Sequence, residues 1–266
     1  MKIAVLGANG YIGKYLTQLL ASNTVTVIPV TRHTVDLTNF QQVKSWLHVV
    51  QPNVIINCAT ATSQFHISDL IYQDVQNNLD IFMNFYNNSH MFDQFINIGS
   101  GAEFDRASNI DHAREFDIFL KQPKDSYGYS KNIIARLVAE KEKFVTLRLF
   151  GCFNSHEPIH RLFQKFVKQS SVDIVDRYVD YISLEDFGII VQHSMNNITI
   201  NKDINCVYPK KYLLSEIFKL FQDIHSVTTQ LTVVSTDSKN YTGSADQLSQ
   251  LNLPLKGLVQ GIKDYI

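Results

Sequence analysis

The chain has 266 residues, of which 45% are hydrophobic and 18% are charged, and its formal net charge is −1. This length allows one good core, or a large domain with a smaller lobe, and the absence of long Lys or Arg runs argues against nucleic-acid and membrane-surface roles. The apolar opening is too short for a signal peptide, and no run reaches the ~18 apolar residues of a membrane span. We therefore expect a cytoplasmic protein.

Short apolar runs alternate with longer helical patterns over the first part of the chain. The runs that we expect to form strands are 3–6, 25–30, 54–57, 95–98 and 145–150. The segments with helical spacing of apolar residues are 11–21, 40–50, 70–86 and 127–140. This alternation predicts right-handed βαβ units and an α/β fold with a doubly wound parallel sheet.

The regular alternation of strand-like and helical segments ends after Phe153. The second part contains a helical pattern at 159–169, extended segments over 172–184, a helix at 213–223, a strand at 230–234 and a closing helix at 255–265. We expect a first domain over 1–152, which the chain re-enters around 183–197. The segments 153–182 and 198–266 would form a smaller α+β lobe.

A glycine-rich segment, Gly7-Ala8-Asn9-Gly10-Tyr11-Ile12-Gly13, follows the first strand and opens the first helix. Glycines at this spacing permit a tight turn and a close approach of backbone N–H groups to a pyrophosphate, and the helix N-terminus favours the negative charge. The segment predicts a Rossmann-type dinucleotide site, with an ordinary strand–helix turn as the alternative. The cofactor contacts expected here are Gly7, Asn9, Gly10, Tyr11, Ile12 and Gly13.

The end of the second strand bears on the choice of dinucleotide. NAD binding favours an acidic residue there, whereas an arginine accommodates the 2′-phosphate of NADP. The sequence Thr31-Arg32-His33 has no acid, so we expect NADP, with NAD as the alternative if Arg32 is a solvated loop residue. Asp36 and Leu37 would border the adenine ring, unless Asp36 or Thr38 caps the next helix.

Tyr127 and Lys131 are four residues apart at the start of a predicted helix. This spacing places them on one face, with Cβ atoms ~5–6 Å apart. A free phenol loses its proton only near pH ~10, and a nearby ammonium favours the phenolate. The pair would exchange a proton with a carbonyl oxygen while hydride moves at its carbon, although a surface Tyr–Lys pair is the alternative.

Ser100 ends the strand that begins at Phe95. The carboxyl edge of a parallel sheet is where ligands bind, so its hydroxyl would hold a substrate carbonyl near the phenol. The alternative is a cap of a helix or turn.

Together these motifs resemble those of the extended short-chain dehydrogenase/reductases, also called NAD-dependent epimerase/dehydratases. The resemblance covers nearly the whole chain, but its motifs are specific only up to Asp186. Members of similar size include dTDP-4-keto-rhamnose reductases and GDP-fucose synthases, and residues 30–37 are similar to the latter, which use NADPH. The matching pieces are the glycine-rich opening, 54–59, the strand end at Ser100, Tyr127-xxx-Lys131, 147–150 and 180–186.

The resemblance implies roles for matching residues. Tyr127 would be the acid/base, Lys131 would favour its phenolate and hold the nicotinamide ribose, and Ser100 would position the carbonyl. Further cofactor contacts are implied for Cys58, Ala59, Thr60, Asn78, Tyr127 and Phe150. For Asn78 a polar helix residue is an equal alternative.

Departures from the family pattern narrow the reaction. The 4,6-dehydratases follow the Ser/Thr with Asp-Glu, where this chain has Gly101 and Ala102, so we expect no dehydration. Glu103 is displaced by one residue and would point elsewhere in an extended segment. GDP-fucose synthases use a Cys near the Ala102 position and a His for 3,5-epimerisation. In this chain His156 or His160 could supply the His, but Ala102 cannot replace the Cys, so we expect a plain ketone reduction. The substrate contacts that remain are Gly101, Ala102, Phe153, His156, Arg161 and Arg177, the arginines for a diphosphate.

The cysteines and the histidine motif give weaker evidence of function. Three cysteines, at 58, 152 and 206, are far apart without a CxxC motif, which indicates buried free thiols. His156-Glu157-Pro158-Ile159-His160 fits the HExxH pattern of zinc proteases, which requires a helix. Because Pro158 removes a backbone N–H there, we expect two unrelated histidines and no metal.

Our first hypothesis is an NADP(H)-dependent reductase of the keto group of a 4-keto-6-deoxy nucleoside-diphosphate sugar, in surface-polysaccharide synthesis. The second is a nucleotide-sugar 4-epimerase with tightly bound NAD. A third is a non-catalytic NADP-binding regulatory subunit, against which the intact Ser100, Tyr127 and Lys131 argue. By analogy with relatives, the helices at 70–86 and 127–140 would form a homodimer.

Overall fold

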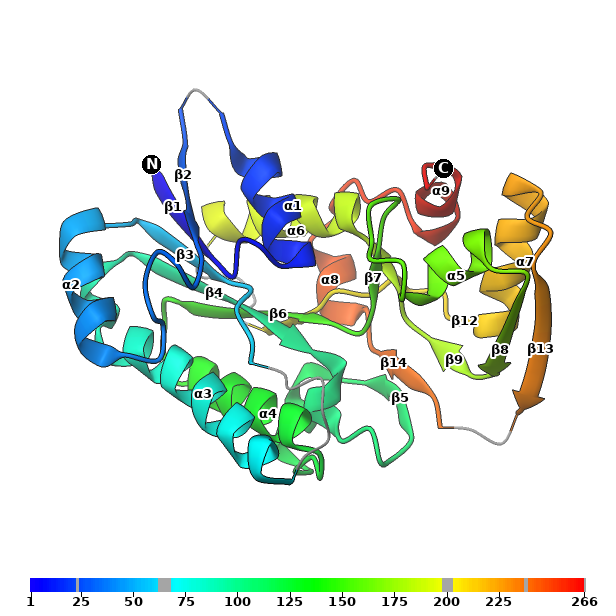
Figure 1. Cartoon of the computed structure of the whole chain (residues 1–266), viewed down its shortest axis with the longest axis horizontal. Coiled ribbons are helices and arrows are strands. Elements are labelled where there is room, and N and C mark those ends of the chain that lie inside the picture. The colour runs from blue at the N-terminus through cyan, green and yellow to red at the C-terminus, as the bar shows by residue number, and fades with distance from the viewer. Residues whose placement is uncertain (23, 62–67, 198–202, 237–238, 266) are drawn as a thin grey trace. The chain divides into compact units, whose positions relative to one another are not determined.

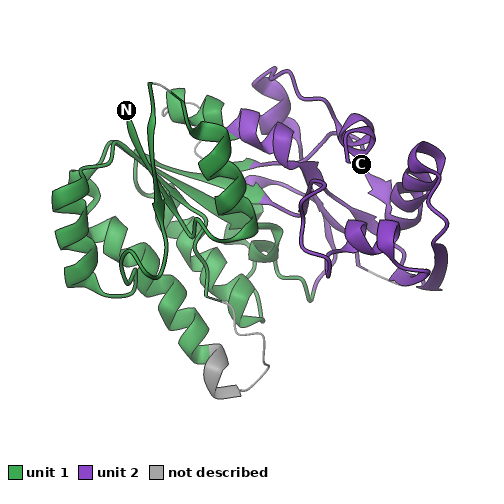
Figure 2. Cartoon of the chain, turned by 45° about the horizontal axis from the view of Figure 1, so that its top comes forward, with its two compact units in different colours: residues 1–107, 116–148, 191–204 green, residues 108–115, 149–190, 205–266 purple. Residues whose placement is uncertain are grey.

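The computed structural model describes residues 1–22, 24–61, 68–197, 203–236 and 239–265, with the backbone alone at 68–71. Two compact units can be distinguished (Figure 2). Unit 1 comprises residues 1–107, 116–148 and 191–204, and unit 2 comprises 108–115, 149–190 and 205–266. The assignment of a cofactor lobe and a substrate lobe stays a prediction.

Unit 1 is built on a six-stranded sheet in the order β11–β6–β4–β3–β1–β2. Strands β2, β1, β3 and β4 pair in parallel, so their carboxyl ends meet at one edge. The predicted doubly wound parallel sheet is therefore confirmed. The strands are β1 (Lys2–Leu6), β2 (Thr26–Val30), β3 (Val54–Asn57), β4 (Gln94–Ser100), β6 (Phe144–Leu149) and β11 (Asp203–Asn205).

Helices cover both faces of this sheet, with α2, α3 and α4 on one face and α1 on the other (Figure 1). Because the central strands are covered on both sides, neighbouring residues such as Ile55 and Ile56 are both fully buried. On the α3/α4 side, the rings of Phe95 and Phe144 stack with centroids 4.9 Å apart. The helices of unit 1 are α1 (Tyr11–Leu20), α2 (Phe40–Val50), α3 (Ser68–Asn87) and α4 (Ser126–Ala139), with 3₁₀ turns η1 (Ser89–Met91), η2 (Gly101–Phe104) and η3 (Glu115–Phe119). Helix α6 (Leu184–Asn196) belongs to unit 2 up to residue 190 and to unit 1 from residue 191.

Unit 2 combines small sheets with short helices. Its core is aromatic, and the fully buried Phe163 ring lies 4.8 Å from Phe153 and 5.0 Å from Phe221 between centroids. The sheets are β10 (Ile182–Ser183) with β7 (Cys152–Phe153), β12 (Tyr212–Leu213) with β9 (Tyr178–Val179), β14 (Tyr241–Gly243) and β5 (Ile110–Ala113), and β13 (Gln230–Ser235) with β8 (Ser171–Val175). The helices are α5 (Leu162–Lys168), α7 (Leu214–His225), α8 (Asp246–Gln250) and α9 (Leu258–Lys263).

Two helix starts were predicted too early. Helix α5 begins at Leu162 because a turn in which the Arg161 N–H bonds to the Pro158 carbonyl precedes it. Helix α9 begins after Gly257, whose φ of +85° lies outside the helical region. The short strands β5, β12 and β14 were not predicted, since two to four residues carry no readable period and form by tertiary pairing.

In the part of the chain that the structure describes, no helix is long and apolar enough to cross a membrane. The HExxH-like string lies in turns at 154–161, as expected from Pro158, and its two histidines do not share a helix.

Candidate functional site

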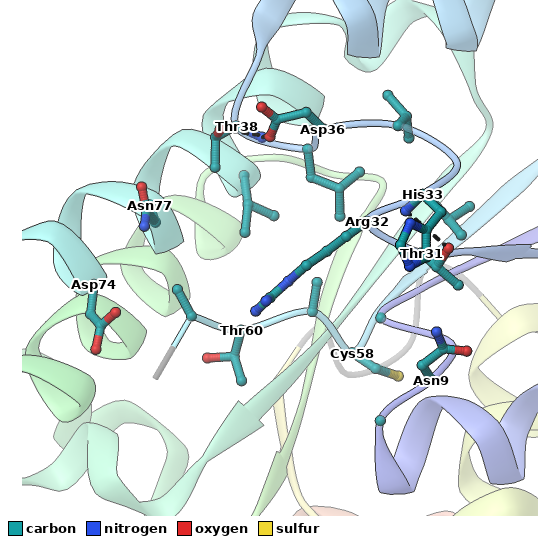
Figure 3. Close-up of a pocket in the computed structure, with 18 residues that line it drawn as sticks. Asn9, Thr31, Arg32, His33, Asp36, Thr38, Cys58, Thr60, Asp74 and Asn77 are labelled. Carbon is teal, nitrogen blue, oxygen red and sulfur yellow. Dashed lines mark hydrogen bonds between the residues drawn. The ribbon is translucent and has the colours of Figure 1, made fainter. Parts of the chain in front are cut away.

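A cavity of about 890 Å³ lies in unit 1 at the carboxyl ends of β1, β2 and β3 (Figure 3). It includes nine of the predicted cofactor residues: Gly7, Asn9, Gly10, Arg32, Asp36, Leu37, Cys58, Ala59 and Thr60. The sequence analysis missed further lining residues: Val30, Thr31, His33, Val35, Thr38, Ala61, Asp74, Asn77 and Ile81. Some of these could have been found, since His33 adjoins Arg32, and Asp74 and Asn77 precede Asn78 by one turn and one residue.

The glycines of the first turn are required by close backbone contacts. Gly7 has a φ of +71°, and a Cβ there would lie 2.9 Å from the backbone of Ala59. A Cβ at Gly13 would lie 2.3 Å from the Gly7 carbonyl oxygen, so helix α1 can approach β1 only with glycine at this position. Helix α1 has no side-chain cap and no acidic residue in its first turn. Its N-terminus can therefore receive an anion such as a diphosphate.

Arg32 points across the cavity toward Thr60 (Figure 3). The nearby Asp36 carboxylate accepts bonds from the Thr38 N–H at 3.0 Å and the Thr38 hydroxyl at 2.7 Å. The alternative that Asp36 or Thr38 caps helix α2 is wrong, because Asn39 is the cap and accepts from the Gln42 N–H. The cavity thus has a cation directly after β2 and no carboxylate at that position.

Asn78 is a buried residue of α3 that ties together segments around the cavity. Its side-chain oxygen accepts from the Ala61 N–H at 2.7 Å and from the Thr60 hydroxyl at 3.2 Å. Its amide nitrogen donates to the Ala61 carbonyl at 3.0 Å and to the Ser130 hydroxyl at 3.2 Å. Asn78 therefore fixes the loop after β3 against helix α4.

Ser100 ends β4 and caps η2. Its hydroxyl oxygen accepts from the Ala102 N–H at 3.2 Å, and Glu103 completes the capping box by accepting from the Ser100 N–H. The alternative of a cap is thus confirmed. This bond uses a lone pair of the hydroxyl, so its O–H remains able to donate to a substrate oxygen.

Helix α4 carries Tyr127 in its first turn and Lys131 one turn later. Lys131 is buried, and its Nζ donates to the Ile98 carbonyl of β4 at 3.1 Å. A Cβ at Gly128 would lie 2.6 Å from the Ala102 carbonyl oxygen, so α4 packs directly on the turn that follows Ser100. The start of α4 and the end of β4 are therefore neighbours. Tyr127 is half-buried, with the Arg106 guanidinium 5.7 Å from its ring centre.

The other predicted residues are placed as follows. In unit 1, Tyr11, Ile12 and Gly13 form the first turn of α1, while Gly101 and Ala102 are buried within η2. In unit 2, Phe150 packs on Tyr241 with ring centres 5.1 Å apart.

The substrate candidates of unit 2 have varied surroundings. Phe153 is fully buried in the aromatic core, and His156 is exposed. Arg161 donates to the Glu157 carboxylate at 3.0 Å and to the Cys152 carbonyl at 2.7 Å. Arg177 is half-buried, with its Nη1 3.4 Å from the Lys239 carbonyl. Both arginines thus already have protein partners, and diphosphate binding by them stays a prediction.

A buried ion-pair cluster beside Ser100 was not predicted. Glu103 and Arg148 are fully buried, and Arg148 also pairs with Asp203 at 2.9 Å. Burial raises the pKa of Glu103, an effect that Asp203 adds to and Arg148 opposes. No local pattern predicts the cluster, because its members lie on separate segments of the chain.

Comparison with known proteins gives one family match. The model of the NAD dependent epimerase/dehydratase family matches residues 3–174, which is more than half of the chain. A search of curated proteins gives no significant match.

Solved structures share the fold over the whole chain. A dTDP-4-dehydrorhamnose reductase from Clostridium acetobutylicum is 18% identical with a TM-score of 0.84, and the alignment covers 100% of this chain and 98% of that one. A GDP-mannoheptose C4 reductase from Campylobacter jejuni with NADP bound is 20% identical, with a TM-score of 0.81 and coverage of 99% and 96%. A GDP-L-fucose synthetase from Naegleria fowleri bound to NADP is 14% identical, with a TM-score of 0.81 and coverage of 99% and 91%.

Proposed function

Because this chain belongs to the NAD dependent epimerase/dehydratase family, and is thus an NAD(P)-dependent oxidoreductase of that family, we propose that it reduces the keto group of a 4-keto-6-deoxy nucleoside-diphosphate sugar with NADPH. The observation that carries this proposal is the packing of α4 on the end of β4. It makes the Tyr127 turn a neighbour of Ser100, while the Lys131 ammonium bonds to the same strand. The structures named above lend support, since two are described as reductases of nucleotide-linked sugars and two hold NADP.

In the proposed reaction the chain supplies binding, orientation and a proton. Ser100 would donate its O–H to the keto oxygen and hold it beside the Tyr127 phenol. Tyr127 would transfer its phenolic proton to that oxygen as the carbonyl becomes an alcohol. Lys131 would then stabilise the phenolate that remains, and solvent would return the proton.

The residues around the cavity fit a dinucleotide. The Gly7–Gly10 turn and the uncapped N-terminus of α1 would hold the diphosphate, and Arg32 would bind the 2′-phosphate that distinguishes NADPH from NADH. Lys131 would also bind the nicotinamide ribose. When bound, NADPH supplies the hydride for the keto carbon.

The residues after Ser100 favour reduction over dehydration. A water-eliminating enzyme needs an acid and a base beside the sugar, and Gly101 and Ala102 supply neither. Glu103 cannot substitute as that acid, because its carboxylate is fully buried between the Ser100 N–H and Arg148.

The proposal is tested by NADPH oxidation with dTDP-, GDP-, CDP- and UDP-linked 4-keto-6-deoxy sugars. We expect stoichiometric NADP⁺ and alcohol with at least one of them. Turnover of a nucleotide sugar without added dinucleotide would replace the reductase with a 4-epimerase that retains NAD.

No turnover of any sugar, with dinucleotide binding intact, would overturn the proposal. If Tyr127→Phe then left the biological activity of the protein unchanged, the protein would be a non-catalytic NADP-binding subunit.

A further inference from the structure

We propose that Glu103 is a positioning residue, whose buried carboxylate holds Ser100 in place against helix α4. The inference rests on the proposed function, because it concerns the serine that would orient the keto group.

The Glu103 carboxylate uses its two oxygens for two different tasks. Oε1 accepts from the Ser100 backbone N–H at 2.8 Å, and Oε2 accepts from Arg148 Nε at 2.6 Å. Arg148 is held from its other side by Asp203, with Nη1–Oδ1 at 2.9 Å and Nη2–Oδ2 at 3.0 Å. Arg148 thus pairs with both carboxylates, and of the two only Glu103 contacts Ser100.

The local sequence makes room for this carboxylate. A Cβ at Gly99 would lie 2.6 Å from Glu103 Oε1 and 2.7 Å from the Thr146 methyl group. Any other residue at 99 would therefore displace the Glu103 carboxylate and the Thr146 side chain. The glycine beside Ser100 is explained by the position of Glu103.

The backbone of the same residue is tied to the helix of Tyr127. The Glu103 carbonyl accepts from Asn132 Nδ2 at 2.8 Å, and Asn132 directly follows Lys131. One residue thus joins the Ser100 turn, through its side chain, to helix α4, through its backbone. A shift of Glu103 would change the position of Ser100 relative to Tyr127 and Lys131.

The charges of the cluster indicate that stability alone does not explain Glu103. Arg148 and Asp203 already form an ion pair, and the fully buried Glu103 adds a second carboxyl group whose burial is costly. What the second carboxylate adds is the bond to Ser100.

The test compares Glu103→Gln with Asp203→Asn, since each neutralises one carboxylate of the cluster and only the first touches Ser100. We expect Glu103→Gln to lower kcat roughly 10- to 100-fold, with the KM for NADPH unchanged, and Asp203→Asn to keep kcat within about 3-fold. Unfolding midpoints of both variants identify any loss that is due to folding. Equal losses of kcat in the two variants would overturn the proposal.

A double-mutant cycle separates positioning from a general structural role. In a Ser100→Ala background, Glu103→Gln has no hydroxyl left to misplace and should change kcat less than about 3-fold. If it lowered kcat as much as in the wild type, Glu103 would not act through Ser100.

A second readout does not depend on activity. The Ser100 amide should exchange its hydrogen at least ~10-fold faster in Glu103→Gln, because a carboxylate is the stronger acceptor, and at the wild-type rate in Asp203→Asn. Unchanged exchange in Glu103→Gln would refute the positioning role. If no sugar is reduced but exchange responds as expected, the proposed function fails while the hold of Glu103 on Ser100 stands.

Discussion

Lys131 donates from Nζ to the backbone carbonyl oxygen of Ile98 at 3.1 Å, and so connects the helix of Tyr127 to the strand that ends in Ser100. A buried ammonium needs such a partner, because burial without hydrogen bonds is costly. The bond also fixes the position of the charge relative to the end of the strand. This bond and the close packing of Gly128 on the Ala102 carbonyl are the geometric basis for treating Ser100, Tyr127 and Lys131 as one site.

The first prediction concerns the proton donor. Tyr127→Phe removes the phenolic proton while keeping the ring, and we expect kcat to fall ~10²- to 10⁴-fold with little change in NADPH affinity. Tyr129→Phe is the matched control, since this half-buried tyrosine lies in the same helix at a position not assigned to catalysis, and should stay within about 3-fold. Steady-state kinetics and dinucleotide titration measure both. Similar losses in the two variants would contradict the assignment.

The second prediction concerns the glycine-rich turn. In Gly13→Ala the new methyl group would meet the Gly7 carbonyl at 2.3 Å, so α1 must move from β1. We expect a loss of about 1–3 kcal/mol in free energy of unfolding and at least ~10-fold weaker dinucleotide binding.

Gly257→Ala is its control. Unlike Gly13, Gly257 occupies the left-handed region, with a φ of +85°, and a Cβ there meets nothing within 4 Å. The substitution should cost about 1–3 kcal/mol through backbone strain and leave dinucleotide affinity unchanged. Loss of affinity in both variants would show that global destabilisation, not the turn, is responsible.

The third prediction concerns dinucleotide selectivity. Arg32→Ala removes the cation that points across the cavity, and the Kd for NADPH should rise roughly 10- to 100-fold while that for NADH changes less than about 2-fold. Lys44→Ala, on the exposed side of α2, makes the same change in net charge outside the cavity and should alter neither. Fluorescence titration with both dinucleotides decides the matter. If the binding of NADH weakened to the same extent, Arg32 would bind a part of the molecule that both dinucleotides share.

The fourth prediction concerns a buried ion pair in unit 2. Lys211 Nζ lies 2.9 and 2.8 Å from the two carboxylate oxygens of Asp180, and the Gly243 N–H donates to the same carboxylate. Burial raises the pKa of Asp180 from 3.8 to about 6, although Lys211 opposes this shift. Burial likewise lowers the pKa of Lys211.

The sign of the resulting pH dependence follows from proton binding. Between pH 3.8 and about 6 folded Asp180 holds a proton that the unfolded chain has released, so its contribution to stability is full below this window and is lost as the pH rises through it. The stability advantage of wild type over Asp180→Asn should therefore shrink by about 2 kcal/mol between pH 4 and 7. Urea unfolding across this range measures it. An advantage that grows with pH would mean that Lys211 outweighs burial.

The alternating fold of unit 1 could be predicted from local patterns. Both Ile55 and Ile56 are apolar because both faces of β3 are covered, and the 3.6-residue period of the helices is equally readable. The small sheets of unit 2 could not be predicted from local patterns, because several of their strands are too short to show a period. A two-residue strand such as β9 has no period of its own and exists only because β12 and β14 pair with it.

The site divides in the same way. Tyr127 and Lys131 are linked by a helical period, and Gly7, Gly10 and Gly13 by the geometry of one turn, so sequence spacing alone determined these groups. The position of Glu103 was decided only by tertiary structure, because its partner Arg148 lies 45 residues away on another strand. Spacing in sequence encodes contacts within one element. Contacts between elements depend on how the sheet brings strand ends together. For this reason the sequence showed Glu103 only as an acidic residue displaced by one position, whereas the tertiary structure shows that its carboxylate binds the Ser100 N–H.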